Sequence, residues 1–262
     1  MPSESKSADK MHHDAQKRYF DDHYGTFKEY KLENWRLSFL NRIFQKLEIG
    51  KASMQGDDYY LDIGVGGSGY TVIEAAKLDQ RSIGVDLSAE GIRKAKLFSN
   101  KEGAGDSADF VVCAAEHLPF KEKTLSKVSS VSVLEHLYND KQAIKEISRV
   151  TKQNGRVFIT VPNTYKRMWP FLWLPYYLAD KRSGHLRHYS EEDLVNRFKK
   201  AGLTVREIRY SAHLIKIAQI FLERVFGKNN LASRIWWNFE RRDLSKRNSK
   251  TGLQLTAIFE RL

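Results

Sequence analysis

The most constraining feature of the sequence is an alternation of short apolar segments and longer helical patterns between residues 59 and 161. Strands are predicted at 59–63, 82–85, 110–113, 128–134 and 156–161, and helices at 71–77, 90–99 and 141–150. Consecutive parallel strands require a crossover connection, which is usually a helix. The alternation therefore predicts an α/β fold in which helices cover a parallel sheet.

Two further segments flank this alternating region. The polar residues 1–11 are expected to be disordered, and residues 12–50 to form a helical cap with helices near 12–22 and 30–48. After Pro162 we predict a helix at 190–201, with Ser190 as its N-cap and Gly202 just past its end, and strands at 203–210 and 252–259. One domain is then expected to comprise 51–210 and 251–262, interrupted by a helical insertion at 211–250.

A glycine-rich loop follows the first predicted strand and opens the first helix of the sheet. Its sequence from Asp62 reads DIGVGGSG, with glycines at 64, 66, 67 and 69. Glycines allow a tight turn and a close backbone approach, and a helix N-terminus offers free N–H groups to a ligand. Asp86, at the end of the second strand, can accept hydrogen bonds from ribose hydroxyls. The glycine loop and Asp86 together predict a nucleoside-containing ligand. The alternative is a glycine turn that binds nothing.

The glycine spacing also satisfies the dinucleotide fingerprint, so the loop alone does not separate NAD(H) from S-adenosylmethionine. Asp86 would repel a 2′-phosphate, which argues against NADP. Asp62 lies two residues before the first glycine, and a buried carboxylate there is costly without a partner. The methionine half of S-adenosylmethionine carries an ammonium group that could pair with Asp62, whereas NAD has none. The acid therefore favours S-adenosylmethionine.

At this point the sequence resembles the class I S-adenosylmethionine-dependent methyltransferases, in the type 11 subgroup that includes ubiquinone- and menaquinone-biosynthesis enzymes. The resemblance runs from about residue 56 to 210 and includes the final strand. Six ordered segments carry it: Asp62–Gly69, Asp86, Ala115–Phe120, Val131–His136, Arg149–Arg156 and Gly184–Ser190. The resemblance implies a Rossmann-like, seven-stranded, mostly parallel sheet with an antiparallel last strand, helices on both faces, and the insertion between the last two strands.

The resemblance also implies the residues that bind the cofactor. They are Tyr24, Asp62, Gly64, Gly66, Gly67, Gly69, Asp86, Leu87, Ala115, Glu116 and Ser132. One position departs from the family pattern: where an Asp often contacts the adenine amino group, this chain has Ala114. The adenine contact is then expected from backbone groups or from Glu116. The product would be S-adenosylhomocysteine.

Methyl transfer to an oxygen or an acidic carbon usually needs a general base. The candidate catalytic residues are His136, His188 and Tyr189, with His185 nearby in the sequence. His136 could equally be a structural histidine at the end of a strand. His185 and His188 have a spacing that metal ligands can have, but no clear third ligand accompanies them. We therefore predict no metal site and expect the two histidines to order the acceptor loop together with Arg187.

The acceptor side is predicted from two aromatic segments, 169–178 and the insertion at 211–250. Leu214, Ile217, Phe221 and Val225 lie on one helical stripe of the insertion, flanked by basic side chains. The last 54 residues hold 11 Lys and Arg but only 4 Asp and Glu, so this segment supplies more than half of the net charge of +12. Such a stripe suits an anionic membrane surface, and it equally suits packing on the sheet or a homodimer interface. We predict a small, hydrophobic or lipid-linked acceptor.

Two other functional classes remain open. One is an RNA or protein methyltransferase, which the basic C-terminal segment would favour, although base-methylase motifs such as Asn-Pro-Pro-Tyr are absent from the sequence. The other is a non-catalytic S-adenosylmethionine-binding protein.

The composition excludes several classes of protein. Cys113 is the only cysteine, which excludes a disulfide scaffold and a zinc site built on paired cysteines. No apolar run approaches the ~20 residues of a membrane-spanning helix, and the N-terminal region lacks the apolar core of a signal peptide. We expect a cytoplasmic enzyme with peripheral contact to a membrane surface.

Overall fold

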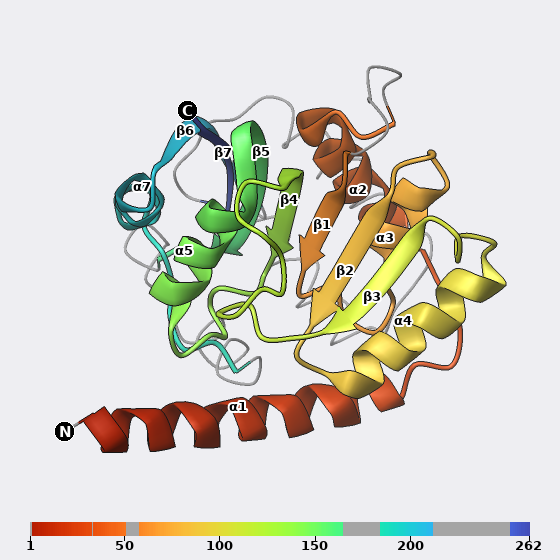
Figure 1. Cartoon of the computed structure of the whole chain (residues 1–262), viewed down its shortest axis with the longest axis horizontal. Helices are drawn as coiled ribbons and strands as arrows, with labels where there is room; N and C mark the ends of the chain where they lie inside the picture. The colour runs from red at the N-terminus through yellow and green to blue at the C-terminus, as the bar shows by residue number, and fades with distance from the viewer. Residues whose placement is uncertain (1, 33, 51–57, 165–183, 212–251) are drawn as a thin grey trace, which may run out of the picture.

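A computed structural model describes residues 2–32, 34–50, 58–164, 184–211 and 252–262 (Figure 1). The strands are β1 (Tyr60–Ile63), β2 (Ser82–Asp86), β3 (Ala108–Val112), β4 (Leu125–Val131), β5 (Thr151–Pro162), β6 (Leu203–Ser211) and β7 (Gln254–Arg261). The helices are α1 (Pro2–Gly25), α2 (Asn34–Leu47), α3 (Tyr70–Ala76), α4 (Ala89–Lys101), α5 (Asp140–Val150) and α7 (Glu191–Lys200). All the strands and helices predicted from the sequence within these ranges are present.

The strands form one seven-stranded sheet in the order β3-β2-β1-β4-β5-β7-β6. Neighbours from β3 to β5 pair in parallel, whereas β7 pairs antiparallel with both β5 and β6. This is the Rossmann-like methyltransferase sheet that the resemblance implied. The order reverses between β1 and β4, so the carboxyl ends of β1, β2 and β4 meet at a topological switch point, where such sheets bind ligands.

Both faces of the sheet are covered because successive side chains of a strand point to opposite faces. Tyr60 and Phe158 pack with the apolar face of α2, which supplies Leu40, Ile43, Phe44 and Leu47. Leu61 and Ile63 of β1, and Val157 and Ile159 of β5, belong instead to the large core shared with α5 and α7. A third cluster packs α3 and α4 beside β3. The alternation in the sequence thus places apolar side chains on both faces of one sheet.

Three predictions need correction. Helix α1 begins at Pro2, so the segment 1–11 that was expected to be disordered is largely helical. Its residues are polar, but Ala, Glu and Lys favour a helix, and proline suits a first helical turn. Strand β4 ends at Val131, not at residue 134, because Ser132 takes a left-handed conformation with φ +54°. Strand β3 ends at Val112, so Cys113 lies beyond it and is half-buried.

Helix α7 confirms its predicted start and end. The side-chain oxygen of Ser190 accepts a hydrogen bond from the backbone N–H of Asp193 at 3.1 Å, as an N-cap does. Gly202 follows the helix with φ +87°, the left-handed conformation of a helix C-terminus. The aromatic segment 169–178 and the insertion at 211–250 lie outside the described residues, apart from Ser211. No helix of the described residues is long and apolar enough to cross a membrane.

The contact between α7 and the antiparallel end of the sheet should dominate the stability of that region. The rings of Phe198 and Phe259 are stacked with centroids 4.1 Å apart, and both side chains are fully buried. We expect Phe198→Ala to lower the free energy of unfolding by about 3–5 kcal/mol, measured by chemical denaturation. Leu97→Ala, on the exposed side of α4, is the control and should change it by less than about 0.5 kcal/mol. Equal effects of the two variants would contradict this assignment.

Candidate cofactor and acceptor site

The glycine loop turns sharply at the carboxyl end of β1. Gly64, Gly66 and Gly69 all have left-handed φ values, between +61° and +74°. The N–H groups of Gly64 and Val65 both donate to the carbonyl oxygen of Val85, at 2.8 and 3.0 Å, which ties the turn to β2. A Cβ atom at Gly64 would lie 2.2 Å from Cγ2 of Val133. The loop therefore packs directly against the segment that follows β4, and there is no room for a side chain at Gly64.

Asp86 holds the middle of this loop from the end of β2. One of its carboxylate oxygens accepts a hydrogen bond from Gly66 N–H at 2.9 Å, and the other accepts from Ser88 N–H at 2.9 Å. Burial raises the pKa of the Asp86 carboxyl, although both backbone hydrogen bonds oppose the shift. Each carboxylate oxygen has a second lone pair. Asp86 can therefore keep the loop in place and still accept a hydrogen bond from a hydroxyl group of a ligand.

Asp62 lies within a chain of buried hydroxyl groups. Thr71 and Ser129 both donate to its carboxylate, and the Tyr60 hydroxyl lies 2.6 Å from the Ser129 oxygen. Because Ser129 gives its hydrogen to Asp62, Tyr60 must donate to Ser129. Burial raises the pKa of Asp62 to about 6, against the effect of the two hydroxyls. Asp62 is therefore a carboxyl whose charge a nearby cationic group would stabilise.

Helix α1 lies across the edge of the sheet at which β1 and β2 end (Figure 1). Its Tyr24 ring lies over the glycine loop: a Cβ atom at Gly66 would be 3.2 Å from the Tyr24 hydroxyl oxygen, and one at Gly67 would be 2.9 Å from Tyr24 Cβ. Asp21 accepts hydrogen bonds from the Ser88 hydroxyl and from Glu90 N–H, at the N-terminus of α4. An anion is favourable at that end of a helix.

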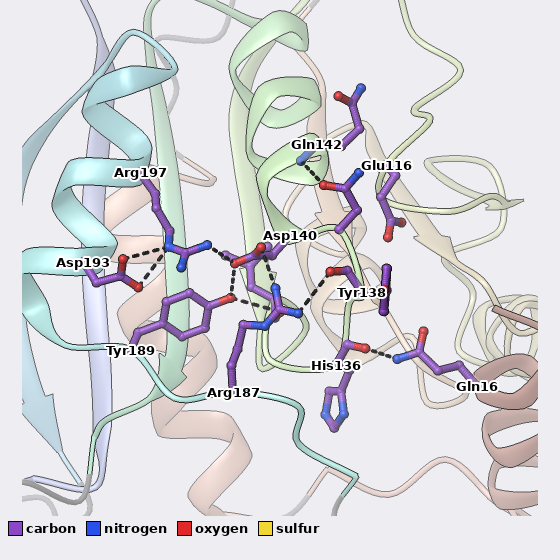
Figure 2. A network of polar contacts seen from close by, with 12 residues as sticks. Gln16, Glu116, His136, Tyr138, Asp140, Gln142, Arg187, Tyr189, Asp193 and Arg197 are labelled. Carbon is purple, nitrogen blue, oxygen red and sulfur yellow. Dashed lines mark hydrogen bonds and ion pairs between the residues drawn. The ribbon is translucent and has the colours of Figure 1, made fainter. Parts of the chain in front are cut away.

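The same helix contacts the two other sides of the site. The His13 ring lies 3.3 Å from a carboxylate oxygen of Glu116, and the Gln16 amide donates to the carbonyl oxygen of His136 (Figure 2). The second carboxylate oxygen of Glu116 is buried and has no hydrogen-bond partner among the residues that the structure describes. Helix α1 thus bridges the ends of β2, β3 and β4.

A pocket lies between α1 and the ends of β1, β2 and β4. Seven of the predicted site residues line it: Tyr24, Gly64, Asp86, Leu87, Ala115, Ser132 and His136. The other seven do not: Asp62, Gly66, Gly67, Gly69, Glu116, His188 and Tyr189. Of these, the three glycines and Asp62 lie in or below the loop that forms its floor, and Glu116 follows the lining residue Ala115.

The structure adds lining residues that sequence reasoning missed. They are Gln16, Phe20, Ile63, Val85, Val133, Leu137 and Cys113. Gln16 and Phe20 lie four residues apart on α1, with Tyr24 a further turn along, and this i, i+4, i+8 spacing was the only available signal. Cys113 was expected to be a buried strand residue; burial and the nearby Asp86 raise its thiol pKa to about 12. A thiol with so high a pKa is a poor nucleophile at neutral pH.

Tyr189 is placed away from the pocket. Its side chain is fully buried, and its hydroxyl lies 2.8 Å from a carboxylate oxygen of Asp140 and 3.1 Å from the carbonyl oxygen of Leu134. Burial, together with the negative charge of Asp140, raises the pKa of this phenol far above its usual range. Tyr189 therefore has a structural role, and His188, half-buried beside it in the sequence, also lies outside the pocket lining.

Asp140 is the centre of a buried ionic network (Figure 2). Arg187 and Arg197 both form ion pairs with its carboxylate, and Arg187 also donates to the carbonyl oxygen of Tyr138 at 3.0 Å. The network joins the start of α5, helix α7 and the segment 184–190. Arg187 was expected to order this segment together with His185 and His188, and its ion pair with Asp140 ties the segment to the start of α5.

The network brings a third group of side chains together at the end of β4. His136 lines the pocket, and its ring lies 4.9 Å from that of His185, between ring centroids. The carboxylate of Glu135, which is fully buried, lies next to both rings. His136 and His185 are 49 positions apart, so the sequence did not place these three residues together.

The chain is similar to known proteins both in sequence and in fold. A protein-family model described as a methyltransferase domain matches residues 61–159, from β1 into β5. Residues 61–159 are therefore a class I S-adenosylmethionine-dependent methyltransferase domain. S-adenosylmethionine is the methyl donor of this family, and S-adenosylhomocysteine is the product.

Individual relatives agree with this assignment. An uncharacterized protein of Methanocaldococcus jannaschii is 36% identical over 123 residues, covering 47% of this chain and 44% of the relative. A ubiquinone/menaquinone biosynthesis C-methyltransferase of Hahella chejuensis is 27% identical over 135 residues, covering 50% and 54%. The chain thus spans about half the length of these curated relatives. The structure of a geranyl diphosphate C-methyltransferase of Streptomyces coelicolor has a TM-score of 0.62 at 16% identity, covering 87% of this chain and 79% of that one.

The site fits this cofactor on three observations. The glycine loop gives a close approach that a Cβ atom would fill, Asp86 has unused lone pairs, and Asp62 has a raised pKa that a cation would lower. The unpartnered oxygen of Glu116 is a fourth group, able to accept from an adenine amino group in place of the Asp that Ala114 replaces.

The steric constraint at Gly64 can be separated from its backbone strain. Gly64 and Gly103 have similar φ values, +74° and +72°, but a Cβ atom at Gly103 would have no neighbour within 4 Å. Both alanine variants should lose roughly 1–2 kcal/mol of stability from the left-handed conformation. Only Gly64→Ala should also weaken the binding of S-adenosylhomocysteine, by about tenfold or more, because its Cβ atom would displace Val133. Calorimetry measures this affinity. Equal binding by the two variants would contradict a close approach at Gly64.

The raised pKa of Asp62 predicts a pH dependence of cofactor binding. In the free protein the carboxyl becomes neutral as pH falls through about 6, and a neutral carboxyl cannot pair with an ammonium group. S-adenosylhomocysteine affinity should therefore be constant above this pH and fall below it, by at most about tenfold per pH unit. Adenosine, which lacks the ammonium group, should show a flat profile, and Asp62→Asn should flatten the profile of S-adenosylhomocysteine. A flat wild-type profile from pH 5 to 8 would remove Asp62 from ammonium binding.

Proposed function

We propose that this protein transfers a methyl group from S-adenosylmethionine to a small-molecule acceptor that is hydrophobic or lipid-linked. The observation that carries the proposal is a pocket, among the described residues, that is lined both by cofactor-binding groups and by apolar side chains. Asp86, Gly64 and Tyr24 line it on one side, and His136 lines it at the other with Phe20, Val133 and Leu137. The cofactor supplies an electrophilic methyl group, so the protein must position the acceptor, exclude water and handle a proton.

The binding roles follow from the contacts already described. Asp86 would accept the ribose hydroxyls, Glu116 the adenine amino group, and Asp62 would pair with the ammonium group. Tyr24 covers the glycine loop, and Ser132, held at φ +54°, lines the pocket. Fixing donor and acceptor in line can lower the activation free energy by about 7–11 kcal/mol.

His136 is the residue that we assign to proton transfer. It is the ionisable imidazole in the pocket lining, and its carbonyl oxygen is fixed by Gln16 of α1. A general base typically contributes about 10²–10⁴-fold. Tyr189 and His188, the other predicted catalytic residues, are better assigned to holding the segment 184–190, because neither lines the pocket.

The hydrophobic character of the acceptor has two supports. One is the apolar side of the pocket. The other is the sequence of the segment 169–178 and the insertion 211–250, which follow β5 and β6 in the chain and lie outside the described residues. The relative in Hahella chejuensis is named for ubiquinone and menaquinone biosynthesis. Peripheral contact of the insertion with an anionic membrane, or its use as a homodimer interface, belongs to the same proposal.

The proposal is tested with methyl-labelled S-adenosylmethionine and fractionated cell extract. Enzyme-dependent label should enter the organic phase. Asp86→Ala should lose this transfer, because each hydrogen bond that a ribose hydroxyl donates to the Asp86 carboxylate is worth about 1.5–3 kcal/mol. That corresponds to roughly 10- to 100-fold in cofactor affinity. Asp109→Ala, which removes an exposed carboxylate from β3, is the matched control and should retain it. Label confined to protein or RNA in the aqueous phase would overturn the small-molecule acceptor, and binding without transfer in any fraction would overturn catalysis.

A further inference from the structure

Glu135, His136 and His185 form a compact cluster at the acceptor end of the pocket. Each offers one ligand atom, and the three atoms all lie within 4.8 Å of one another. Two come from the turn that follows β4, and the third from the segment 184–190. Metal–nitrogen and metal–oxygen bonds of about 2.1 Å would bring tetrahedral ligand atoms to roughly 3.4 Å apart. The three atoms would have to move closer together when an ion binds.

The chemistry of the three donors is selective. Two imidazoles and one carboxylate are the protein ligands of catalytic zinc sites, in which a fourth position stays open to water or substrate. Glu135 is fully buried, whereas His136 and His185 are half-buried, and His136 lines the pocket. A buried carboxylate beside two imidazoles is more stable when a cation shares the site. The donor set and its burial therefore both favour a divalent ion.

The surroundings of the cluster fix its donors in place. The Nδ1 atom of His136 lies 3.3 Å from the carbonyl oxygen of Gly184. With the hydrogen on Nδ1, the imidazole donates to this carbonyl and keeps the Nε2 lone pair for a metal, as metal-bound histidines usually do. The N–H of Leu186 donates to the carbonyl oxygen of Glu135 at 2.8 Å, so His185 is held in register with the turn.

We propose that Glu135, His136 and His185 bind one divalent transition-metal ion, with zinc as the best match, and that this ion binds an oxygen atom of the acceptor. The proposal rests on the proposed function and narrows it to acceptors with a hydroxyl group, such as phenols or enols. The ion lowers the pKa of that hydroxyl, so the role of His136 becomes that of a ligand. The hydroxyl proton leaves to solvent, the oxygen lone pair forms the bond to the methyl carbon, and the carbon–sulfur electron pair remains on sulfur.

The site can be tested with the metal alone. Tag-free protein, stripped with a chelator, should bind one Zn²⁺ per chain in calorimetry, and Co²⁺ should give the visible absorption bands of a low-coordinate cobalt site. Glu135→Gln and His185→Ala should each weaken Zn²⁺ binding by more than about 100-fold, since even outer-shell changes cost 10- to 100-fold. His117→Ala removes an exposed histidine and is the matched control, which should bind as the wild type does.

Cofactor binding separates this proposal from the proposed function. Both cluster variants should bind S-adenosylhomocysteine like the wild type, because neither residue lines the cofactor pocket. Equal Zn²⁺ affinity in the wild type and both variants would locate any ion elsewhere and would overturn the site. Methyl transfer that survives chelation but is lost in His136→Ala would also overturn it, while leaving His136 as a general base and the proposed function intact.

Discussion

The arrangement of the acceptor side depends on one buried carboxylate. Asp140 is 3% exposed and is shared by Arg187, Arg197 and Tyr189, which come from two segments that follow it by about 50 residues in the chain. Removing one partner of a buried ion pair typically lowers the stability by about 3–5 kcal/mol. The ion pairs of Asp140 therefore hold the segments that carry these side chains together. The sheet places Glu135 and His136 at the end of β4; Asp140 is what brings the segment 184–190, and with it His185, against them.

The cofactor side is built on a different principle. Its contacts are mostly between backbone groups and one carboxylate: the N–H groups of Gly64 and Val65 with β2, and those of Gly66 and Ser88 with Asp86. Such contacts depend on the path of the chain more than on the identity of side chains. This explains why a short glycine motif followed by an acid about 20 residues later can be found in a sequence, whereas the acceptor side, made of side chains from distant segments, cannot.

The parts of the fold that were predictable are those governed by local rules. Helical and strand periodicity, the Ser190 cap and the glycine turn depend on neighbouring residues, and all were predicted correctly. The end of strand β4 was predicted three residues too late because Val133 and Leu134 are apolar. Only the structure shows that they face the pocket and the core after the turn at Ser132. Tyr189 looked like a catalytic phenol in the sequence, and its distance from the pocket follows from its bond to Asp140. The early start of α1 was missed because its polar residues gave no amphipathic pattern.

The position of α1 has a consequence for the order of events in turnover. The helix covers the pocket through Tyr24 over the glycine loop, His13 on Glu116 and Gln16 on the backbone of His136. Opening of the helix would break all three contacts, so release of a large product and opening of the helix are coupled steps. Because Gln16 binds the same residue that lines the acceptor end, an acceptor that steadies His136 also steadies the closed helix. By linkage, the closed helix then favours acceptor binding to the same extent.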